Sequence, residues 1–223
     1  MSDNLPDFRS FGFDGRAALA QIVESSSYSS VEQAVASLAV FAHPETVAQT
    51  GGRNIFSVIR CRNGAERGTF MELGEGNRVM LDDNKAPTDA SIWAHGIARR
   101  KFKDVQFNHL WAGSKDVCLY TSLANICMLP AFLSKLSDTD EGVRSALRFR
   151  AFELFGDFLL ESQGRDPKPA KYNELRWAET LPPVRNLELA YRDAMRRKAS
   201  DRTTRCAREL GWVFSGFRPD PSV

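Results

Sequence analysis

The sequence predicts an α+β fold in which helices pack around a small antiparallel sheet. Apolar residues recur every three or four positions in segments near both ends of the chain, as in helices with one buried face. Residues 54–83 are rich in β-branched and aromatic residues and are broken by Asn-Gly and Gly-rich turns, which indicates two or three strands. Residues 102–110 alternate apolar and polar side chains, which favours another strand.

Length and composition favour one globular domain that covers residues 1–223. Hydrophobic residues make up 43% of the 223 positions, which is enough for a substantial core. The formal net charge is only +2, which excludes the extreme basicity of a histone-like protein. Any affinity for nucleic acid must therefore come from local clusters of positive charge.

The sequence predicts a cytoplasmic protein with reduced thiols and no membrane association. The N-terminal residues, MSDNLPDFRS, are polar and do not form the basic start and apolar run of a signal peptide. No stretch approaches the ~18 consecutive apolar residues that a membrane helix needs. The four cysteines contain no C-x-x-C pair, which argues against a structural zinc site: Cys61, Cys118, Cys127 and Cys206.

Two helices are predicted near the N-terminus, over residues 14–26 and 29–43. Ser29 and Glu32 have the spacing of a capping box, in which each side chain can bind a free backbone N–H of the first turn. The second helix must end before Pro44, because a proline disfavours helical geometry in the residue that precedes it.

Further helices are predicted after residue 87. A short one begins at Thr88 and ends near Gly96. A longer one covers residues 138–162, with Asp138 and Glu141 at cap-like positions at its start. Its apolar stripe consists of Val143, Leu147, Ala151, Leu154 and Phe158. After a proline-rich connector, residues 185–211 predict a basic helical segment that carries eight Lys or Arg residues against four acids, counted from Arg185 to Leu210.

Residues 107–136 contain an ordered set of polar residues between two apolar runs. Asn108 and His109 close the alternating run, and Asn125 follows the histidine by sixteen positions. An apolar run and Pro130 then lead into a predicted helix, AFLSKL, where a proline suits the first turn. This order of strand, histidine, loop, asparagine, strand and helix resembles the HNH-type, or ββα-metal, nuclease motif. The resemblance covers about thirty residues, and we place the ββα-metal-like unit at about residues 103–138.

The resemblance implies metal-dependent hydrolysis of nucleic acid. His109 would be the general base, since its ordinary pKa near ~6.5 lies close to cellular pH. Asn125 would hold the loop so that the histidine points correctly. Asn108, with Ser134 or Asp138, would hold Mg²⁺ or another divalent cation, which takes oxygen ligands. Asn108 and Ser134 depart from the family pattern, because the first is usually an acid or a histidine and the second an Asn or a histidine. Neutral ligands of this kind predict weak metal binding. The fold of the motif can therefore be kept while its nuclease activity is reduced or lost.

Basic residues cluster around this unit and predict contacts with the phosphates of a nucleic acid, with DNA as the expected polymer. Phosphate contacts supply most of the non-specific affinity for nucleic acid. The expected contact residues are Arg99, Arg100, Lys101, Lys103, Lys115 and Lys135.

Two other interpretations compete with this one. Asp83-Asn84-Lys85, with Glu72 upstream, matches the acid and Asp-x-Lys elements of another nuclease class, although this stretch also fits a turn. The second alternative is a non-catalytic nucleic-acid-binding or scaffold protein that keeps the fold. The remaining histidines, His43 and His95, have no partner at ligand spacing, and we interpret them as structural.

Overall fold

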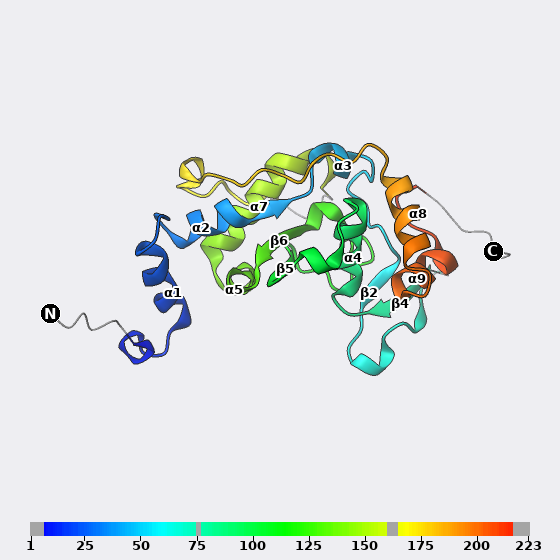
Figure 1. Ribbon diagram of the computed structural model, residues 1–223, viewed down its shortest axis with the longest axis horizontal. Helices are drawn as coiled ribbons and strands as arrows, with labels where there is room; N and C mark the ends of the chain where they lie inside the picture. The colour runs from blue at the N-terminus through cyan, green and yellow to red at the C-terminus, as the bar shows by residue number, and fades with distance from the viewer. Residues whose placement is uncertain (1–6, 75–76, 160–164, 216–223) are drawn as a thin grey trace.

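Two three-stranded sheets hold the strands of this protein, and helices surround them (Figure 1). The computed structural model describes residues 7–74, 77–159 and 165–215. The predicted α+β class is confirmed. The prediction of one antiparallel sheet is wrong, because the strands divide between two sheets and one strand pair is parallel.

The first sheet has the order β1-β6-β5 and is antiparallel throughout. Its strands are β1 (Val40–Phe41), β5 (Val105–His109) and β6 (Ile126–Pro130). His109 pairs with Ile126, and Asn108 pairs with Cys127. The strand predicted over residues 102–110 is therefore adjacent to the strand predicted between the loop and Pro130. Pro130 forms the last pair of this ladder and then precedes a helix, because it has no N–H to continue the sheet.

The second sheet has the order β2-β4-β3. Its strands are β2 (Val58–Arg60), β3 (Phe70–Leu73) and β4 (Asn77–Asp82). β3 and β4 form the expected antiparallel pair, whereas β2 runs parallel to β4. Residues 75 and 76 of the predicted Gly-rich turn lie outside the described residues. The parallel pair leaves Arg60 and Asp82 side by side at the same end of the sheet.

Most helices lie near the predicted positions with shifted ends, but the helix at Pro44–Ala48 was not predicted, and residues 40–41 of the predicted 29–43 helix form a strand. The bounds are α1 (Gly15–Glu24), α2 (Val31–Leu38), α3 (Pro44–Ala48), α4 (Lys85–Ala94), α5 (Ala131–Ser134), α6 (Leu136–Thr139), α7 (Glu141–Phe155), α8 (Leu187–Arg197) and α9 (Arg202–Leu210). The predicted end of the 138–162 helix lies partly outside the described residues, at 160–162.

Two predicted helix caps are wrong by one or two residues. Ser30, not Ser29, caps α2, since its side chain accepts the N–H of Gln33. Asp140, not Asp138, caps α7, since it accepts the N–H of Val143. Asp140 is also held by Arg16 of α1 at 2.5 Å, so a long-range ion pair favours the later start. Local spacing cannot reveal such a partner.

Two other helix predictions need correction. α4 begins at Lys85 rather than Thr88, because Pro87 lies in the first turn, where its missing N–H breaks no helical hydrogen bond. The basic segment 185–211 is two helices rather than one. It breaks because Asp201 caps α9 by accepting the N–H of Thr203, and the new helix begins after the four residues 198–201.

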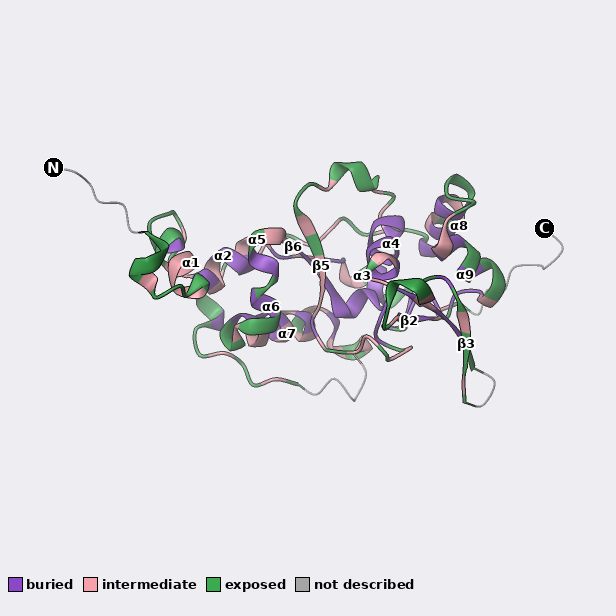
Figure 2. Cartoon of the chain, turned by 90° about the horizontal axis from the view of Figure 1, so that it is seen from below, coloured by how far each residue is buried: buried purple, intermediate pink, exposed green. Residues whose placement is uncertain are grey.

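One buried apolar cluster joins the two sheets and most of the helices. Figure 2 shows buried residues gathered along the middle of the molecule, on α4, β6 and α8, while the N-terminal end is largely exposed or intermediate. Phe56, Trp93 and Tyr191 meet edge to face within this cluster, with ring centroids 5.6–5.8 Å apart. Over the described residues, the search for a helix long and apolar enough to cross a membrane finds none.

Ion pairs attach α9 to the sheet and to α4. Arg202 lies 2.8 Å from Asp82, whose side chain is fully buried. The backbone N–H of Asp83 and the charge of Arg202 both favour the charged form of the Asp82 carboxylate. Burial raises the pKa of Asp82, and the charge of Arg202 opposes that rise. Without the arginine, a buried charge would remain with little compensation.

We predict that Arg202→Met lowers the free energy of unfolding by about 3 kcal/mol, the range for breaking a buried pair by removing one partner. Because burial already disfavours the charged form of Asp82, the loss grows as the pH rises through its raised pKa. It shrinks in acid, where Asp82 is protonated in both states. Urea unfolding at several pH values measures this loss.

The control is Arg196→Met, which removes an exposed pair with Asp193 and should cost no more than about 0.5 kcal/mol. Adding Asp82→Asn to Arg202→Met should restore part of the stability. Equal losses at all pH values would show that Asp82 is not the group that Arg202 compensates.

Candidate nucleic-acid site

His109 lies at the end of β5 and is held by the segment that precedes β6. Its Nε2 donates a hydrogen bond to the carbonyl of Tyr120 at 2.8 Å, and the two rings stack with centroids 5.2 Å apart. Because a carbonyl can only accept, Nε2 carries the hydrogen, and Nδ1 is the unprotonated nitrogen of the neutral ring. Burial lowers the pKa of His109, and the positive charge of Arg60 lowers it further. The hydrogen bond to the Tyr120 carbonyl acts in the opposite direction and raises this pKa. A neutral imidazole with a free Nδ1 can accept a proton.

Asn125 lies within the same turn and is fully buried. Its Oδ1 accepts the N–H of Trp111 at 2.8 Å, and its Nδ2 donates to the carbonyls of Trp111 and Leu119, both at 3.2 Å. The side chain therefore ties both ends of the loop between β5 and β6. This geometry agrees with the loop-holding role that the resemblance implies, and that role in catalysis stays a prediction.

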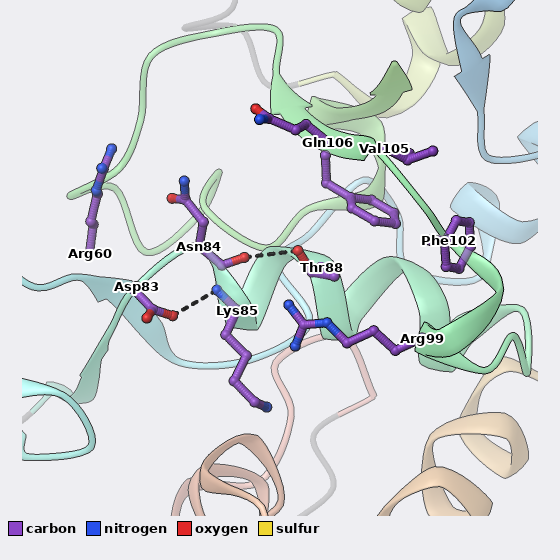
Figure 3. A pocket seen from close by; sticks show the side chains of 10 residues that line it. Arg60, Asp83, Asn84, Lys85, Thr88, Arg99, Phe102, Val105 and Gln106 are labelled. Atoms are coloured by element: carbon purple, nitrogen blue, oxygen red, sulfur yellow. Dashed lines mark hydrogen bonds between the residues drawn. The ribbon is translucent and has the colours of Figure 1, made fainter. Parts of the chain in front are cut away.

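A pocket of about 590 Å³ opens beside β5, on the N-terminal part of α4. Figure 3 shows Arg60, Asn84, Thr88, Gln106 and Arg99 around its opening, with Arg99 reaching back over α4. These residues come from the end of β2, the start of α4, β5 and the 3-10 helix Arg99–Lys101. The complete lining is Arg60, Asp83, Asn84, Lys85, Thr88, Arg99, Phe102, Val105, Gln106 and Phe107.

Two cations of this pocket carry no compensating acid. Neither Arg60 nor Arg99 forms an ion pair with any residue that the structure describes, and both are exposed. The acid of the pocket, Asp83, lies 3.2 Å from Arg67 and 3.7 Å from Arg202, so other cations neutralise it. The pocket therefore has a net positive potential that favours an anionic ligand.

The pocket also has an aromatic wall. Phe102 and Phe107 meet edge to face with centroids 5.5 Å apart, and both are partly exposed. Polar groups of Asn84, Thr88 and Gln106 lie around it. Cations, amides and aromatic surface together suit a ligand that joins a phosphate to a flat ring.

The Asp83-Asn84-Lys85 motif does not offer a free lysine. Lys85 belongs to α4, and Figure 3 shows its side chain running away from Asn84 and Gln106. Its ammonium pairs with the carboxylates of Asp89 and Asp201, the second at 2.5 Å. Glu72 lies on β3, opposite Arg78. The lysine thus links α4 to α9, and the arrangement does not favour the Asp-x-Lys interpretation.

The predicted metal ligands do not form a preformed cation cage. The Ser134 hydroxyl is bound to the Ala131 carbonyl at 2.8 Å and to Gln106 Oε1 at 3.1 Å. Asp138 is largely exposed and pairs with Lys135 at 3.4 Å. The Asn108 Nδ2 group is buried without a hydrogen-bond partner. Among the described residues, no group of three or more His, Cys, Asp or Glu side chains could hold a metal. These donors fit a divalent cation poorly, and binding of one stays a prediction.

The predicted basic residues are spread over several surfaces. Arg99 lines the pocket, Lys101 and Lys103 lie exposed beside it, and Lys115 lies in the loop that follows β5. Lys135 is engaged by Asp138. Arg60 is the pocket cation that sequence reasoning missed. Its position at the end of a strand-like run, NIFSVIR, was the available signal, but only the parallel β2–β4 pair places it beside α4.

Comparison with known proteins gives no matching family model, no similar curated protein and no similar solved structure. The resemblance to the HNH-type motif therefore depends on the residues of about 103–138 alone and stays a prediction.

We predict that Asn125→Ala lowers the free energy of unfolding by about 3 kcal/mol. Three hydrogen bonds disappear, and each is worth about 1 kcal/mol, with a further penalty for backbone groups left buried without partners. Urea unfolding measures the change. As a control, Asn63→Ala removes an exposed asparagine that caps a short 3-10 helix, and it should cost under about 1 kcal/mol. A loss below about 1 kcal/mol for Asn125→Ala would mean that other contacts hold the loop.

Proposed function

We propose that this protein binds nucleic acid through the pocket beside β5. The observation that carries the proposal is the pair of uncompensated arginines, Arg60 and Arg99, in one concave site with the aromatic wall of Phe102 and Phe107. Planar guanidinium groups bind phosphates, like carboxylates, through paired N–H donors. The aromatic wall gives a base a surface to contact, which inorganic phosphate would not use.

The neighbouring sequence supports the same ligand. Arg100, Lys101 and Lys103 follow Arg99 directly and are exposed, so they extend the positive surface away from the pocket. Clustered cations of this kind contact successive phosphates and release the counterions that surround a nucleic acid. The net charge of +2 would not produce affinity by itself, but such a cluster can.

The proposal predicts salt-dependent binding that depends on the pocket arginines. Fluorescence anisotropy with labelled DNA and RNA oligonucleotides, at several salt concentrations, measures affinity and salt slope. Arg60→Glu/Arg99→Glu should weaken binding by at least about tenfold and lower the salt slope by about one to two units, since each lost phosphate contact contributes ~0.7–0.9.

The matched control is Arg53→Glu/Lys171→Glu, which reverses two exposed charges outside the pocket. It has the same net charge as the pocket variant. Equal weakening by both double variants would mean that only total charge matters and that the pocket is not the binding site. Phe107→Ala should reduce affinity without a change in salt slope, because it removes contact with a base rather than with a phosphate.

A second candidate function is hydrolysis of the bound phosphodiester, with His109 as general base. Arg60 favours it, because this residue lines the pocket and, after burial, its charge further lowers the pKa of His109. The neutral ring, with its hydrogen on Nε2, presents Nδ1 as the proton acceptor. Because the predicted donors Asn108, Ser134 and Asp138 fit a divalent cation poorly, no step of this candidate is assigned to one. The alternative is a binding protein without hydrolysis.

This candidate predicts a cleavage rate that rises with pH as His109 loses its proton, with a midpoint below about 6.5 because burial lowers its pKa. His109→Ala should reduce cleavage by ~10²–10⁴-fold, the usual contribution of a general base, and should leave binding unchanged. Arg60→Gln should move the midpoint upward, since it removes a charge that disfavours the imidazolium.

The assay compares plasmid DNA and labelled RNA with Mg²⁺, with Mn²⁺ and with a chelator. Cleavage that His109→Ala leaves unchanged would refute His109 as the base. Binding without cleavage by the wild-type protein under every condition would favour the non-catalytic alternative.

A further inference from the structure

A second pocket of about 500 Å³ lies on the other side of Arg99. α4, the segment that follows it and the end of α8 form its walls. Its apolar surface comes from Ile92, Trp93, Ile97, Ala98 and Ala194. Both pockets share Arg99 and Lys85, so they are neighbours along one surface.

Four cations stand around this second pocket. Arg99 and Arg100 come from the basic run after α4, and Arg197 and Lys198 come from the end of α8. All four are exposed, and none forms an ion pair within the part of the chain that the structure describes. The end of α8 and the basic run are about 100 residues apart in sequence, so the fold is what joins their charges.

The acids of the pocket do not cancel these charges. Asp89 and Asp201 both pair with Lys85, and Asp89 also accepts the hydroxyl hydrogen of Thr203 at 2.7 Å. Burial further raises the pKa of Asp89, which disfavours its charged form. The cations at the opening therefore act on whatever approaches from solvent.

We infer that the second pocket is a second nucleotide subsite, and that one single strand of nucleic acid runs from the first pocket to the second across Arg99. This inference rests on the proposed function. An apolar floor under a cationic opening suits a base and its phosphate, and binding grooves for single strands combine these two elements. In a duplex the bases are stacked and paired inside the helix. A base of a duplex must unstack and unpair before it can enter a pocket, which costs free energy, whereas a base of a single strand is already unpaired.

The test measures the affinity of the full chain for oligothymidylates of about three and about twelve nucleotides, which lie below and inside the usual site sizes for single strands. The short strand fills one pocket, whereas the long strand reaches both. Arg197→Glu/Lys198→Glu should leave the short strand unaffected. It should weaken the long one by at least about tenfold and lower its salt slope by about 1.4, or ~0.7 for each of two contacts. Arg99→Glu should weaken both strands, because Arg99 borders both pockets.

The controls separate this inference from the proposed function. Arg53→Glu/Lys171→Glu should have an equally small effect on the affinity for long and for short strands. A thermal melt of Arg197→Glu/Lys198→Glu checks that the charge reversal has not unfolded α8, and Arg197→Gln/Lys198→Gln removes the two charges without reversing them.

If long strands bind the wild type and Arg197→Glu/Lys198→Glu with equal affinity, the second subsite is refuted and the first is unaffected. A duplex that binds as tightly as the long strand, with the same loss in the variant, would overturn the single-strand path. No binding of any strand to the wild type would remove both proposals.

Discussion

The hydroxyl of Thr121 satisfies backbone groups on which both sheets depend. It accepts the N–H groups of Ile55 and Phe56, at 3.1 and 3.0 Å, just before β2 begins. Asn54 forms two further hydrogen bonds here. Its Oδ1 accepts the N–H of Thr121, and its Nδ2 donates to the carbonyl of Phe56. All of these groups are buried, where an unpaired donor or acceptor costs about 1–3 kcal/mol. The approach to the second sheet is thus fastened to the turn that leads into the first.

That turn also determines where the candidate functional groups lie. Tyr120 accepts the His109 hydrogen bond through its carbonyl, and its hydroxyl donates to the carbonyl of Asp83, at the start of α4. Asn125, at the other end of the same buried segment, holds the loop. The segment from Tyr120 to Asn125 therefore orients the histidine, the loop and the edge of the first pocket together. A site built on such satisfied backbone groups is rigid, which suits the binding of a ligand with fixed geometry.

Sequence patterns were sufficient where the interactions are local. The alternation of Phe107 and its neighbours predicted β5, because side chains on a strand alternate between two faces. The apolar run before Pro130 and the resemblance predicted the strand that follows the loop. Cap positions at Ser30 and Asp140 were missed by one or two residues, since neighbouring polar residues satisfy the same local rule. The parallel pairing of β2 with β4 could not be predicted, because it depends on residues that are distant in the chain.

The same limit applies to the candidate site. His109 and Asn125 could be identified from their spacing, whereas Arg60 and the end of α8 could not. The cap of α9 shows why. Asp201 caps α9 through the N–H of Thr203, which lies in the same segment, but its bond to Lys85 of α4 is not visible in the pattern of residues 185–211. A long-range contact thereby divided the basic segment and turned the end of α8 toward α4.

The distribution of charge follows from these internal pairs. The chain has nearly equal numbers of acids and bases, 28 and 30, so an even surface would have almost no net potential. However, the carboxylates of Asp82, Asp89 and Asp201 form ion pairs with Arg202 and Lys85. These ion pairs lie where the sheet, α4 and α9 meet. The arginines at the two pocket openings are left without acids among the described residues. Low-dielectric walls around a concave opening strengthen the field of such charges. The acids that attach α9 therefore lie against Lys85 and Arg202, whereas Arg60, Arg99 and Arg197 at the pocket openings form no ion pair with a described residue.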